Sequence, residues 1–255
     1  TYTPTSFVSG GAALKALTTG VDTVRVSGPP LVALPNATRV VTVSAPGITM
    51  NVPSVGAGLS ASGYASLNAP RHGGVNVVVK SSNPSVAQVA PNNVTAGADS
   101  IIVPLADGQT YVSFYVIGID SQVGSPIITA SANGFNDGTA PAAIVQPIVE
   151  LYNLGTSQTA GGADAPFYAA TGIPYSGTNT FYTNQPRAAG KPALPVTFTS
   201  GTPTVGTLTT TGLTAALINL AIGPGGYYTP TSVAGGGVAF RPLTAGTTTV
   251  SAAIP

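Results

Sequence analysis

The residues that could carry out acid–base or metal chemistry are few in this chain of 255 residues. The single histidine, His72, stands in a turn rich in Pro and Gly at residues 69–74, where loop tips collect polar residues without needing a function. A Ser/His/Asp triad needs a histidine that a carboxylate orients beside a hydroxyl group, and nothing around His72 indicates that arrangement. One histidine also excludes a multi-histidine metal site within one chain.

The acidic residues are equally sparse. Seven are spread along the chain: Asp22, Asp99, Asp107, Asp120, Asp137, Glu150 and Asp164. Asp107 and Asp137 each precede a glycine, which is typical of hairpin turns. Glycoside hydrolysis needs two carboxylates held across a cleft, and no such pair stands out. Calcium sites commonly use an Asp-x-Asp pattern, which is missing here, so calcium stays open only through backbone carbonyl groups between domains. We expect no catalytic, metal-binding or cofactor-binding residue, and therefore no enzyme.

Composition excludes several classes of partner. Eight Lys and Arg residues and a formal net charge of +1 leave too little positive charge to bind the phosphates of a nucleic acid. The basic residues are scattered singly and no apolar run is long enough to span a bilayer, so we expect no membrane insertion. Cysteine is absent, which excludes disulfides and thiolate sites. A surface of such low charge has little repulsion between copies and favours lateral assembly.

Aromatic residues are the best interaction candidates. Five of them are interleaved with Gly, Pro, Ser, Thr and Asn: Phe167, Tyr168, Tyr175, Phe181 and Tyr182. Tyrosine offers apolar area and a hydroxyl at low side-chain entropy cost, which suits protein contacts and stacking on sugar rings. The alternative is packing in a core, because neighbouring residues of a strand point to opposite faces. We expect one residue of each adjacent pair to face the core and the other to be free for contact.

The chain reads as a succession of short strands. Runs rich in Val, Ile, Thr and Tyr are broken by Gly, Pro and Asn at intervals of roughly 8 to 12 residues, which indicates an all-β sandwich or barrel. The longest helix candidate, residues 213–222 (LTAALINLAI), lies between Thr-rich and Gly-Pro-Gly segments. By comparison with residues 100–106 we interpret it as a strand.

The beginning of the chain is repeated near its end. Residues 2–6 and 228–232 both read YTPTS, at an offset of 226 (228 − 2), and further matches follow at the same offset. Repetition of this kind is the signature of an array of similar modules. We expect the module junctions to involve Tyr2, Pro29, Pro147, Tyr227 and Tyr228.

Two internal comparisons set the length of a module. Residues 79–89 (VKSSNPSVAQV) align with residues 198–208 (FTSGTPTVGTL) at an offset of 119 (198 − 79), as a strand, an X-Pro turn and a second strand. A closing strand occurs three times, beginning at Gly20, Gly124 and Gly246, at spacings of 104 (124 − 20) and 122 (246 − 124). These lengths are those of Ig-like domains.

We therefore divide the chain into three parts. Residues 1–30 are expected to be the C-terminal strands of a preceding Ig-like module, available as a donated or exchanged segment. Residues 31–147 form an Ig-like module, and residues 148–255 form a second one that we expect to lack its last strand. An open sandwich edge is a site of aggregation or exchange. A continuation of the polypeptide, or a strand from a neighbouring copy, would cover it.

Residues 73–132 resemble the bacterial Ig-like (Big-type) domains found in tandem within large secreted and surface proteins. The resemblance is carried by GGVNVVVKSSNPSVAQV, the turn Asp107-Gly108 and YVSFYVIGIDSQVGSPIITASANGF, and residues 235–253 (GGGVAFRPLTAGTTTVSAA) are similar. It implies tandem Ig-like β-sandwich modules in an elongated array, serving as spacers, stalks, adhesin shafts or filament subunits. Residues 158–194 depart from the pattern because they are longer and more aromatic than a tight Ig-like loop.

Three functions compete. The leading hypothesis is an extracellular structural protein, part of a fibre, stalk, sheath or surface layer that self-assembles through low-charge faces and strand completion. Its partners would be other copies of itself or adjacent Ig-like modules of the same polypeptide. The second is an adhesin segment that recognises carbohydrate or a cell surface through the aromatic loop at residues 167–182. The third is a non-catalytic appendage of a large secreted enzyme.

Overall fold

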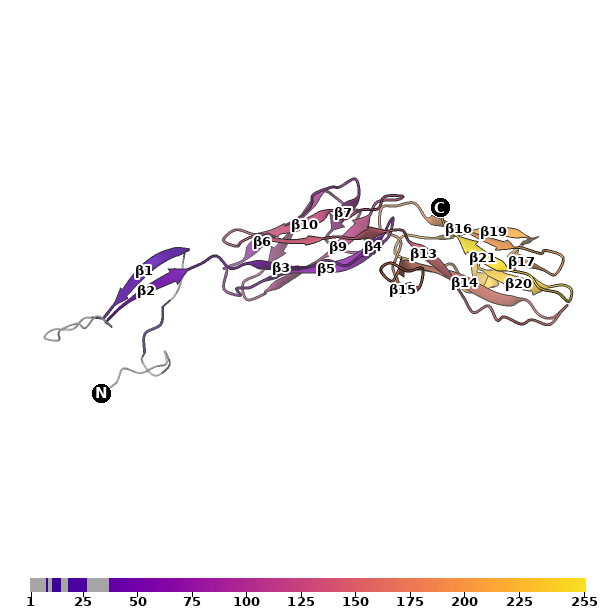
Figure 1. Cartoon of the computed structure of the whole chain (residues 1–255), viewed down its shortest axis with the longest axis horizontal. Helices are drawn as coiled ribbons and strands as arrows, with labels where there is room; N and C mark the ends of the chain where they lie inside the picture. Colours follow the sequence, from indigo (N-terminus) through magenta and orange to yellow (C-terminus); the bar gives the residue numbers. More distant parts are fainter. Residues whose placement is uncertain (1–7, 9–10, 15–17, 27–36) are drawn as a thin grey trace.

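The chain is built from β-strands. The structure is a computed structural model that describes residue 8 and residues 11–14, 18–26 and 37–255. No α-helix occurs in that part of the chain, and a short 3-10 helix, η3, spans Val233–Gly235. Figure 1 shows an elongated molecule with a hairpin at one end, followed by two β-rich modules. The sequence prediction of an all-β fold made of tandem sandwich modules is confirmed.

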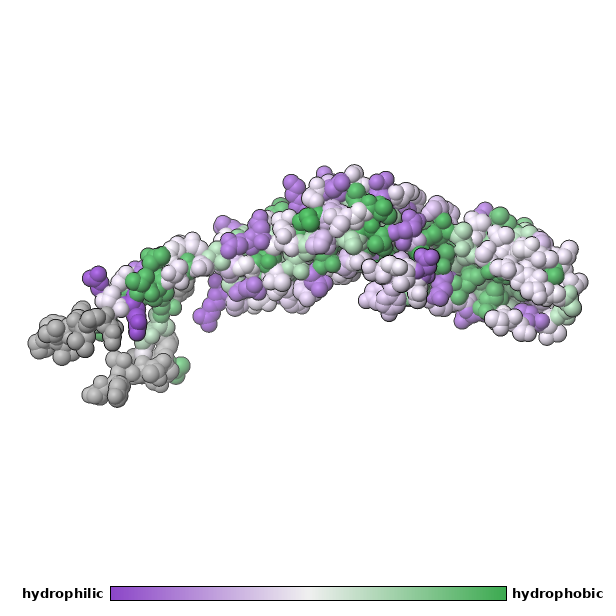
Figure 2. Space-filling view, in the orientation of Figure 1, coloured by the Kyte–Doolittle hydropathy of each residue, from purple (hydrophilic) through white to green (hydrophobic). Residues whose placement is uncertain are grey.

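A two-stranded hairpin precedes the first module. It pairs β1 (Gly20–Arg25) with β2 (Thr38–Val43) in antiparallel fashion, and neither strand has another sheet partner among the described residues. All six residues of β1 are exposed, and Figure 2 shows an apolar patch over the hairpin. β1 and β2 lie on opposite sides of the predicted boundary at residue 30, and the division of the chain into three parts stays a prediction.

The first module is a sandwich of two four-stranded sheets. One sheet has the order β3 (Ile48–Asn51), β5 (Ser60–Leu67), β9 (Tyr111–Gly118), β7 (Ala87–Ala90). The other has the order β11 (Gly138–Pro141), β10 (Ile127–Ser131), β6 (Val75–Ser81), β8 (Ser100–Leu105). A short parallel pair, β4 (Val55–Gly56) and β12 (Ile144–Val145), adds to the side of the sandwich.

The second module has the same two layers. Its larger sheet has the order β13 (Ile148–Tyr152), β14 (Ala165–Pro174), β20 (Val238–Pro242), β17 (Gly206–Thr210), β18 (Leu213–Ala215), and β15 (Phe181–Asn184) pairs with the far part of β14. Its smaller sheet has the order β19 (Leu217–Ile222), β16 (Leu194–Ser200), β21 (Val250–Ala253). The segment 213–222, interpreted as a strand in the sequence, forms β18 and β19.

Each module has its own apolar core between its sheets. In the first, Val77 and Val79 of β6 meet Phe114 of β9. In the second, Phe167 of β14 and Phe198 of β16 pack edge to face, with ring centroids 5.6 Å apart. Alternate residues along a strand face the same side, so β6 and β16 bury every second side chain. Burial of these apolar side chains stabilises the sandwich.

Seven strands of the two modules correspond in order and in pairing. The pairs are β3 with β13, β5 with β14, β6 with β16, β7 with β17, β8 with β19, β9 with β20 and β10 with β21. Ile128 lies opposite Ser81 in the first module, and Val250 lies opposite Ser200 in the second. The sequence offset of 122 (250 − 128) relates Ile128 to Val250, and the offset of 119 (200 − 81) relates Ser81 to Ser200. The strand pairing in the second module is therefore the one that the sequence alignments predict. Within the described residues, no strand of the second module corresponds to β11 or β12.

Candidate functional site

The second module is open along the outer edge of β21. In the first module β10 has two neighbours, β6 and β11, whereas the equivalent strand β21 has only β16 within the described residues. Backbone groups of an unpaired edge strand are a template for another strand. Within residues 37–255, the edge of β21 is therefore open to β-pairing with a further segment.

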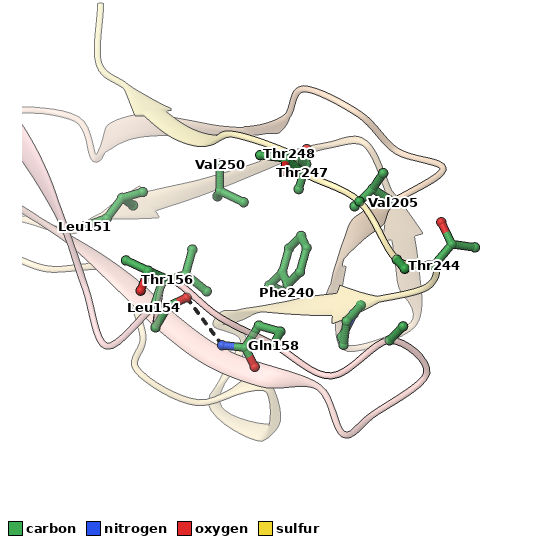
Figure 3. Close-up of a pocket in the computed structure, with 15 residues that line it drawn as sticks. Leu151, Leu154, Thr156, Gln158, Val205, Phe240, Thr244, Thr247, Thr248 and Val250 are labelled. Carbon is green, nitrogen blue, oxygen red and sulfur yellow. Dashed lines mark hydrogen bonds between the residues drawn. The ribbon is translucent and has the colours of Figure 1, made fainter.

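A groove runs beside this edge. It has a volume of about 570 Å³ and separates β21 and the loop before it from β13 and the loop that follows β13. Figure 3 shows the apolar side chains that turn into it, among them Leu151, Phe240 and Val250. The remaining lining residues are mostly small or polar, and the Gln158 amide donates a hydrogen bond to the Gly155 carbonyl oxygen at 3.4 Å. We call this feature the groove.

The first module shows what fills the equivalent position. There the segment after β11 buries the side chains of Ala142 and Ile144 completely or nearly so. Ile144 exchanges two backbone hydrogen bonds with Gly124, at 2.7 and 3.0 Å, and on the other side the Val55 amide donates to the Ala143 carbonyl oxygen at 2.9 Å. The closing segment is thus bonded on both edges and inserts apolar side chains between the sheets. The glycine equivalent to Gly124 is Gly246, which lines the groove.

A second site joins the two modules. Arg187, which is 3% exposed, donates two hydrogen bonds to the carboxylate of Asp120 in the first module, with Nη2 3.2 Å from Oδ2. Its Nη1 also donates to the Gly58 carbonyl oxygen at 3.1 Å, and its Nε donates to the Pro192 carbonyl oxygen at 2.9 Å. Bidentate arginine–carboxylate pairs fix both distance and orientation. Gly58 has φ of +75°, and a Cβ at this position would clash with Arg187, so glycine is required here.

Gln185 completes this joint. Its buried side chain accepts a hydrogen bond from the Gly56 amide at 2.9 Å and donates one to the Ser54 carbonyl oxygen at 2.8 Å. Main-chain bonds add to it, because the Ser60 amide donates to the Pro186 carbonyl oxygen at 3.0 Å. All of these bonds run from the loop of the second module to the β4–β5 region of the first, so they restrain the angle between the modules. We call this set of contacts the joint.

A third feature is a cluster of tyrosines on the second module. Tyr168 stacks on Tyr152 with ring centroids 5.4 Å apart and planes inclined by 13°, and it meets the edge of Tyr228 at 6.0 Å. Tyr227 lies 4.8 Å from Tyr228. These four rings line a depression of about 340 Å³ together with Asn184 and other residues. We call it the tyrosine cluster.

One hydroxyl of the tyrosine cluster is tied to a carboxylate. The Tyr152 hydroxyl donates to Glu150 Oε2 at 2.6 Å. This hydrogen bond to the carboxylate, with burial as the next cause, raises the pKa of Tyr152 to about 12.

The predicted interaction residues have different surroundings. Phe167 is fully buried in the core of the second module. Tyr168 belongs to the tyrosine cluster, and Phe181 meets the edge of Tyr152 at 6.5 Å. Tyr175 and Tyr182 are about half exposed and lie together with ring centroids 4.5 Å apart. Whether these residues contact a partner stays a prediction.

The predicted junction residues are also divided. Pro147 is buried at the boundary between the modules, where it shares a small cavity with Ala57 and Arg187. Tyr227 and Tyr228 lie in the tyrosine cluster. Tyr2 and Pro29 lie outside the described residues. Sequence reasoning missed the joint itself; the signal for it in the sequence was Arg187, two residues after Gln185, in a chain with few charged residues.

His72 and Asp107 bond to the backbone of turns. His72 contacts the Gln109 carbonyl oxygen through Nε2 at 2.9 Å and accepts from the Gly74 amide through Nδ1 at 3.1 Å. The Gly73 amide donates to Asp107 Oδ1 at 2.8 Å, which lowers the pKa of Asp107. Within the described ranges, no three His, Asp or Glu side chains come together as a metal site would require. Those ranges also contain no helix long and apolar enough to cross a membrane.

Comparisons with known proteins find distant structural similarity and no matching family. No family model matches the sequence, and no curated protein matches it. Among solved structures, the chain is similar to a type II cohesin dyad from the adaptor ScaA scaffoldin of Acetivibrio cellulolyticus. The identity is 12%, the match covers 82% of this chain and 88% of that chain, and the TM-score is 0.26. A similarity at this level carries no argument about function, so the fold stands on its strand order and core.

Proposed function

We propose that this chain is a non-enzymatic structural segment of an extracellular fibre, stalk, sheath or surface layer. Its modules would be Ig-like domains of the bacterial type that residues 73–132 resemble, and its partners would be further modules or further copies of the chain. The work of such a protein is mechanical: it holds distance and transmits load.

The joint is the observation that carries this proposal. The buried Arg187 forms a bidentate pair with Asp120 of the first module, and the buried Gln185 bonds to backbone atoms of the first module. Domains of one chain move relative to one another by default, and a bidentate ion pair together with buried hydrogen bonds restrains that motion. A fixed angle between two modules of the same strand order is what an array requires if it is to stay straight under load.

Low charge and an open edge support assembly. The whole chain holds eight basic and seven acidic residues, so identical faces repel one another little. The groove offers an unpaired strand edge beside apolar side chains, which is the arrangement that β-strand addition uses.

Electron microscopy of the purified chain tests the proposal. Negatively stained samples at high concentration are expected to show ordered polymers with a regular repeat. Single particles alone, over a broad range of concentration and salt, would contradict the structural function.

The tyrosine cluster favours a second candidate function, carbohydrate recognition by an adhesin. Aromatic faces bordered by an amide side chain suit the apolar face and the hydroxyl groups of a sugar ring. A glycan array tests it, with Tyr228→Ala expected to abolish binding and Tyr64→Ala, an equally exposed tyrosine of the first module, expected to leave it unchanged. An array without signal removes this candidate.

A further inference from the structure

We propose that the groove binds β2 of a second copy, which adds to the outer edge of β21 as an antiparallel strand and closes the second module. This inference rests on the proposed structural function and names the partner and the segment that perform the assembly. It follows from the hairpin at the other end of the molecule.

The hairpin is equivalent to the strands that close the first module. Thr23 lies opposite Val40 in the hairpin as Ile127 lies opposite Pro141 in the first module. The first strand of the hairpin is therefore related to β10 by an offset of 104 (127 − 23), which is also the spacing between Gly20 and Gly124. The second strand is related to β11 by an offset of 101 (141 − 40). Those glycines, Gly20, Gly124 and Gly246, share an unusual backbone, with φ of +149°, +158° and +156°. β1 therefore corresponds to β10 and β21, and β2 corresponds to β11.

The offset of 101 continues beyond the strand. It places Val41 on Ala142, Val43 on Ile144 and Pro46 on Pro147 (147 − 46). β2 thus leads into β3 as the closing segment of the first module leads into β13. The chain carries a closing strand with apolar residues at the two required positions, and at its other end a module whose closing position is a groove.

The hairpin is weakly held where it is. An isolated two-stranded hairpin is marginally stable in water, and β1 and β2 have no further sheet partner among the described residues. Val41 and Val43, the two side chains that would enter the groove, are only half-buried in the hairpin. Apolar side chains left partly in water indicate a segment that gains by docking elsewhere.

Docking exchanges one partner of β2 for an equivalent one. The edge of β2 that pairs with β1 is the edge that would pair with β21, so β21 takes the place of β1. The backbone hydrogen bonds to β1 are regained with β21. Val41 and Val43, which are half-buried in the hairpin, and the apolar lining of the groove leave water fully only in the docked form. By equivalence with Ile144 and Gly124, the backbone of Val43 would bond to Gly246.

The assembly is head to tail. The donor strand lies at one end of the elongated molecule and the groove in the module at the other end (Figure 1). Such a contact uses two different surfaces and does not close on itself, so it propagates into a linear polymer. One copy, with its two modules, is the repeat.

Engineered disulfides test the register. In the docked form Val40 would lie directly opposite Thr249, a position that permits a disulfide between antiparallel strands. The chain has no cysteine of its own. Under oxidising conditions the double variant Val40→Cys/Thr249→Cys is expected to give a ladder of dimers, trimers and larger species on a non-reducing gel. Each single variant stops at dimers, and Val40→Cys/Thr214→Cys, with the second cysteine on the distant strand β18, gives no ladder above that background.

A lock on the hairpin tests the exchange. Thr23 and Val40 are opposite within one copy, so Thr23→Cys/Val40→Cys is expected to form a disulfide that keeps β2 on β1. Polymer mass should fall at least roughly tenfold on oxidation and return on reduction. Polymerisation of the locked protein at the level of the unmodified protein would overturn the exchange.

A matched pair of substitutions tests the inserted side chain. Val43→Asp places a charge in the groove and is expected to lower polymer mass roughly tenfold to hundredfold. Val40→Asp, on the outward face of the same strand, leaves it nearly unchanged. Thermal unfolding of the two modules should be the same in both variants, because neither residue belongs to their cores.

The outcomes separate this inference from the proposed function. If the unmodified chain forms polymers but the Val40–Thr249 ladder is missing, another segment occupies the groove and the inference is wrong, while the structural function stands. If the unmodified chain forms no polymers, the structural function fails first.

Discussion

The first and second modules use the same seven strands in the same order, yet one is closed and the other is open. In the first, residues 138–145 fill the side of the sandwich with buried Ala142 and Ile144. In the second, the equivalent space is a groove of about 570 Å³. The two modules therefore differ, within the described residues, in whether the outer edge of the equivalent strand, β10 or β21, is paired.

The modules also differ in one loop. Residues 175–193 connect β14 to β16 in the second module and supply Gln185 and Arg187 to the joint. The equivalent connection in the first module, residues 68–74, is a short turn held by His72 and Asp107. The closing strand and the long loop therefore occur in different modules, and each serves a different contact.

The largest effect should come from truncating the matched core phenylalanines. Phe114 and Phe198 are both fully buried, one in each module. Replacing either by alanine is expected to cost about 3–5 kcal/mol of unfolding free energy. Calorimetry should show that each substitution lowers mainly the transition of its own module. Equal loss in both modules would mean that they unfold as one unit.

Opening the first module should make it resemble the second. Ile144→Ala is expected to cost about 2–4 kcal/mol, because a buried closing side chain is lost and a cavity remains. The measurement is urea unfolding followed by hydrogen exchange of β10, whose outer amides should lose protection. Leu217→Ala, at an exposed position of β19, is the control and should change stability little. Unchanged protection of β10 would show that residues 138–145 are not what closes the first module.

Breaking the joint should loosen the angle between modules and leave the cores intact. Arg187→Ala removes the buried guanidinium and is expected to cost about 1–3 kcal/mol, below the value for a fully buried pair because the Asp120 side chain is 44% exposed. Small-angle scattering should show a broader distribution of lengths. Arg241→Ala, which breaks the exposed pair with Asp164 inside the second module, should leave that distribution unchanged. An unbroadened distribution for Arg187→Ala would mean that the backbone bonds of the joint suffice.

The smallest effect concerns Tyr152 in the tyrosine cluster. Since the folded pKa is raised to about 12, the folded state holds the proton more tightly than the unfolded chain. Its contribution to stability is therefore complete below the ordinary tyrosine pKa of about 10 and is lost as the pH rises towards 12. Ultraviolet titration should show one tyrosine that ionises at a higher pH than the others, and Glu150→Gln should return the pKa of Tyr152 towards the ordinary value. If the titration curves of the two proteins are the same, the hydrogen bond to Glu150 is not the cause of the raised Tyr152 pKa.

Much of the fold could be predicted from repetition in the sequence. The alignment of Ser81 with Ser200 predicted equivalent strand positions, and the pairing of β10 and β21 reproduces them. The three closing-strand glycines were aligned by sequence and share one backbone conformation. Repetition works here because the same strand needs the same alternation of buried residues and the same turn chemistry each time it occurs.

The contacts between repeats could not be predicted in this way. Arg187 and Asp120 are 67 residues apart, and neither has a counterpart in the other module that would align with it. The equivalence of β2 with β11 was missed because few residues besides Thr38 with Thr139 and Pro46 with Pro147 are identical at the offset of 101. Tyr152 was missed because a single tyrosine in a strand gives no sign of the rings that fold against it.

The unequal loops have a consequence for how a polymer would bend. Inside each copy the connection between modules is clamped by residues 185–191, whereas residues 68–74 make no hydrogen bond to β1 or β2 in the described part of the chain. A filament of such copies would alternate stiff and compliant hinges, with one soft hinge per subunit. Its persistence length would then be governed by the junctions between subunits, and it would curve in steps rather than smoothly.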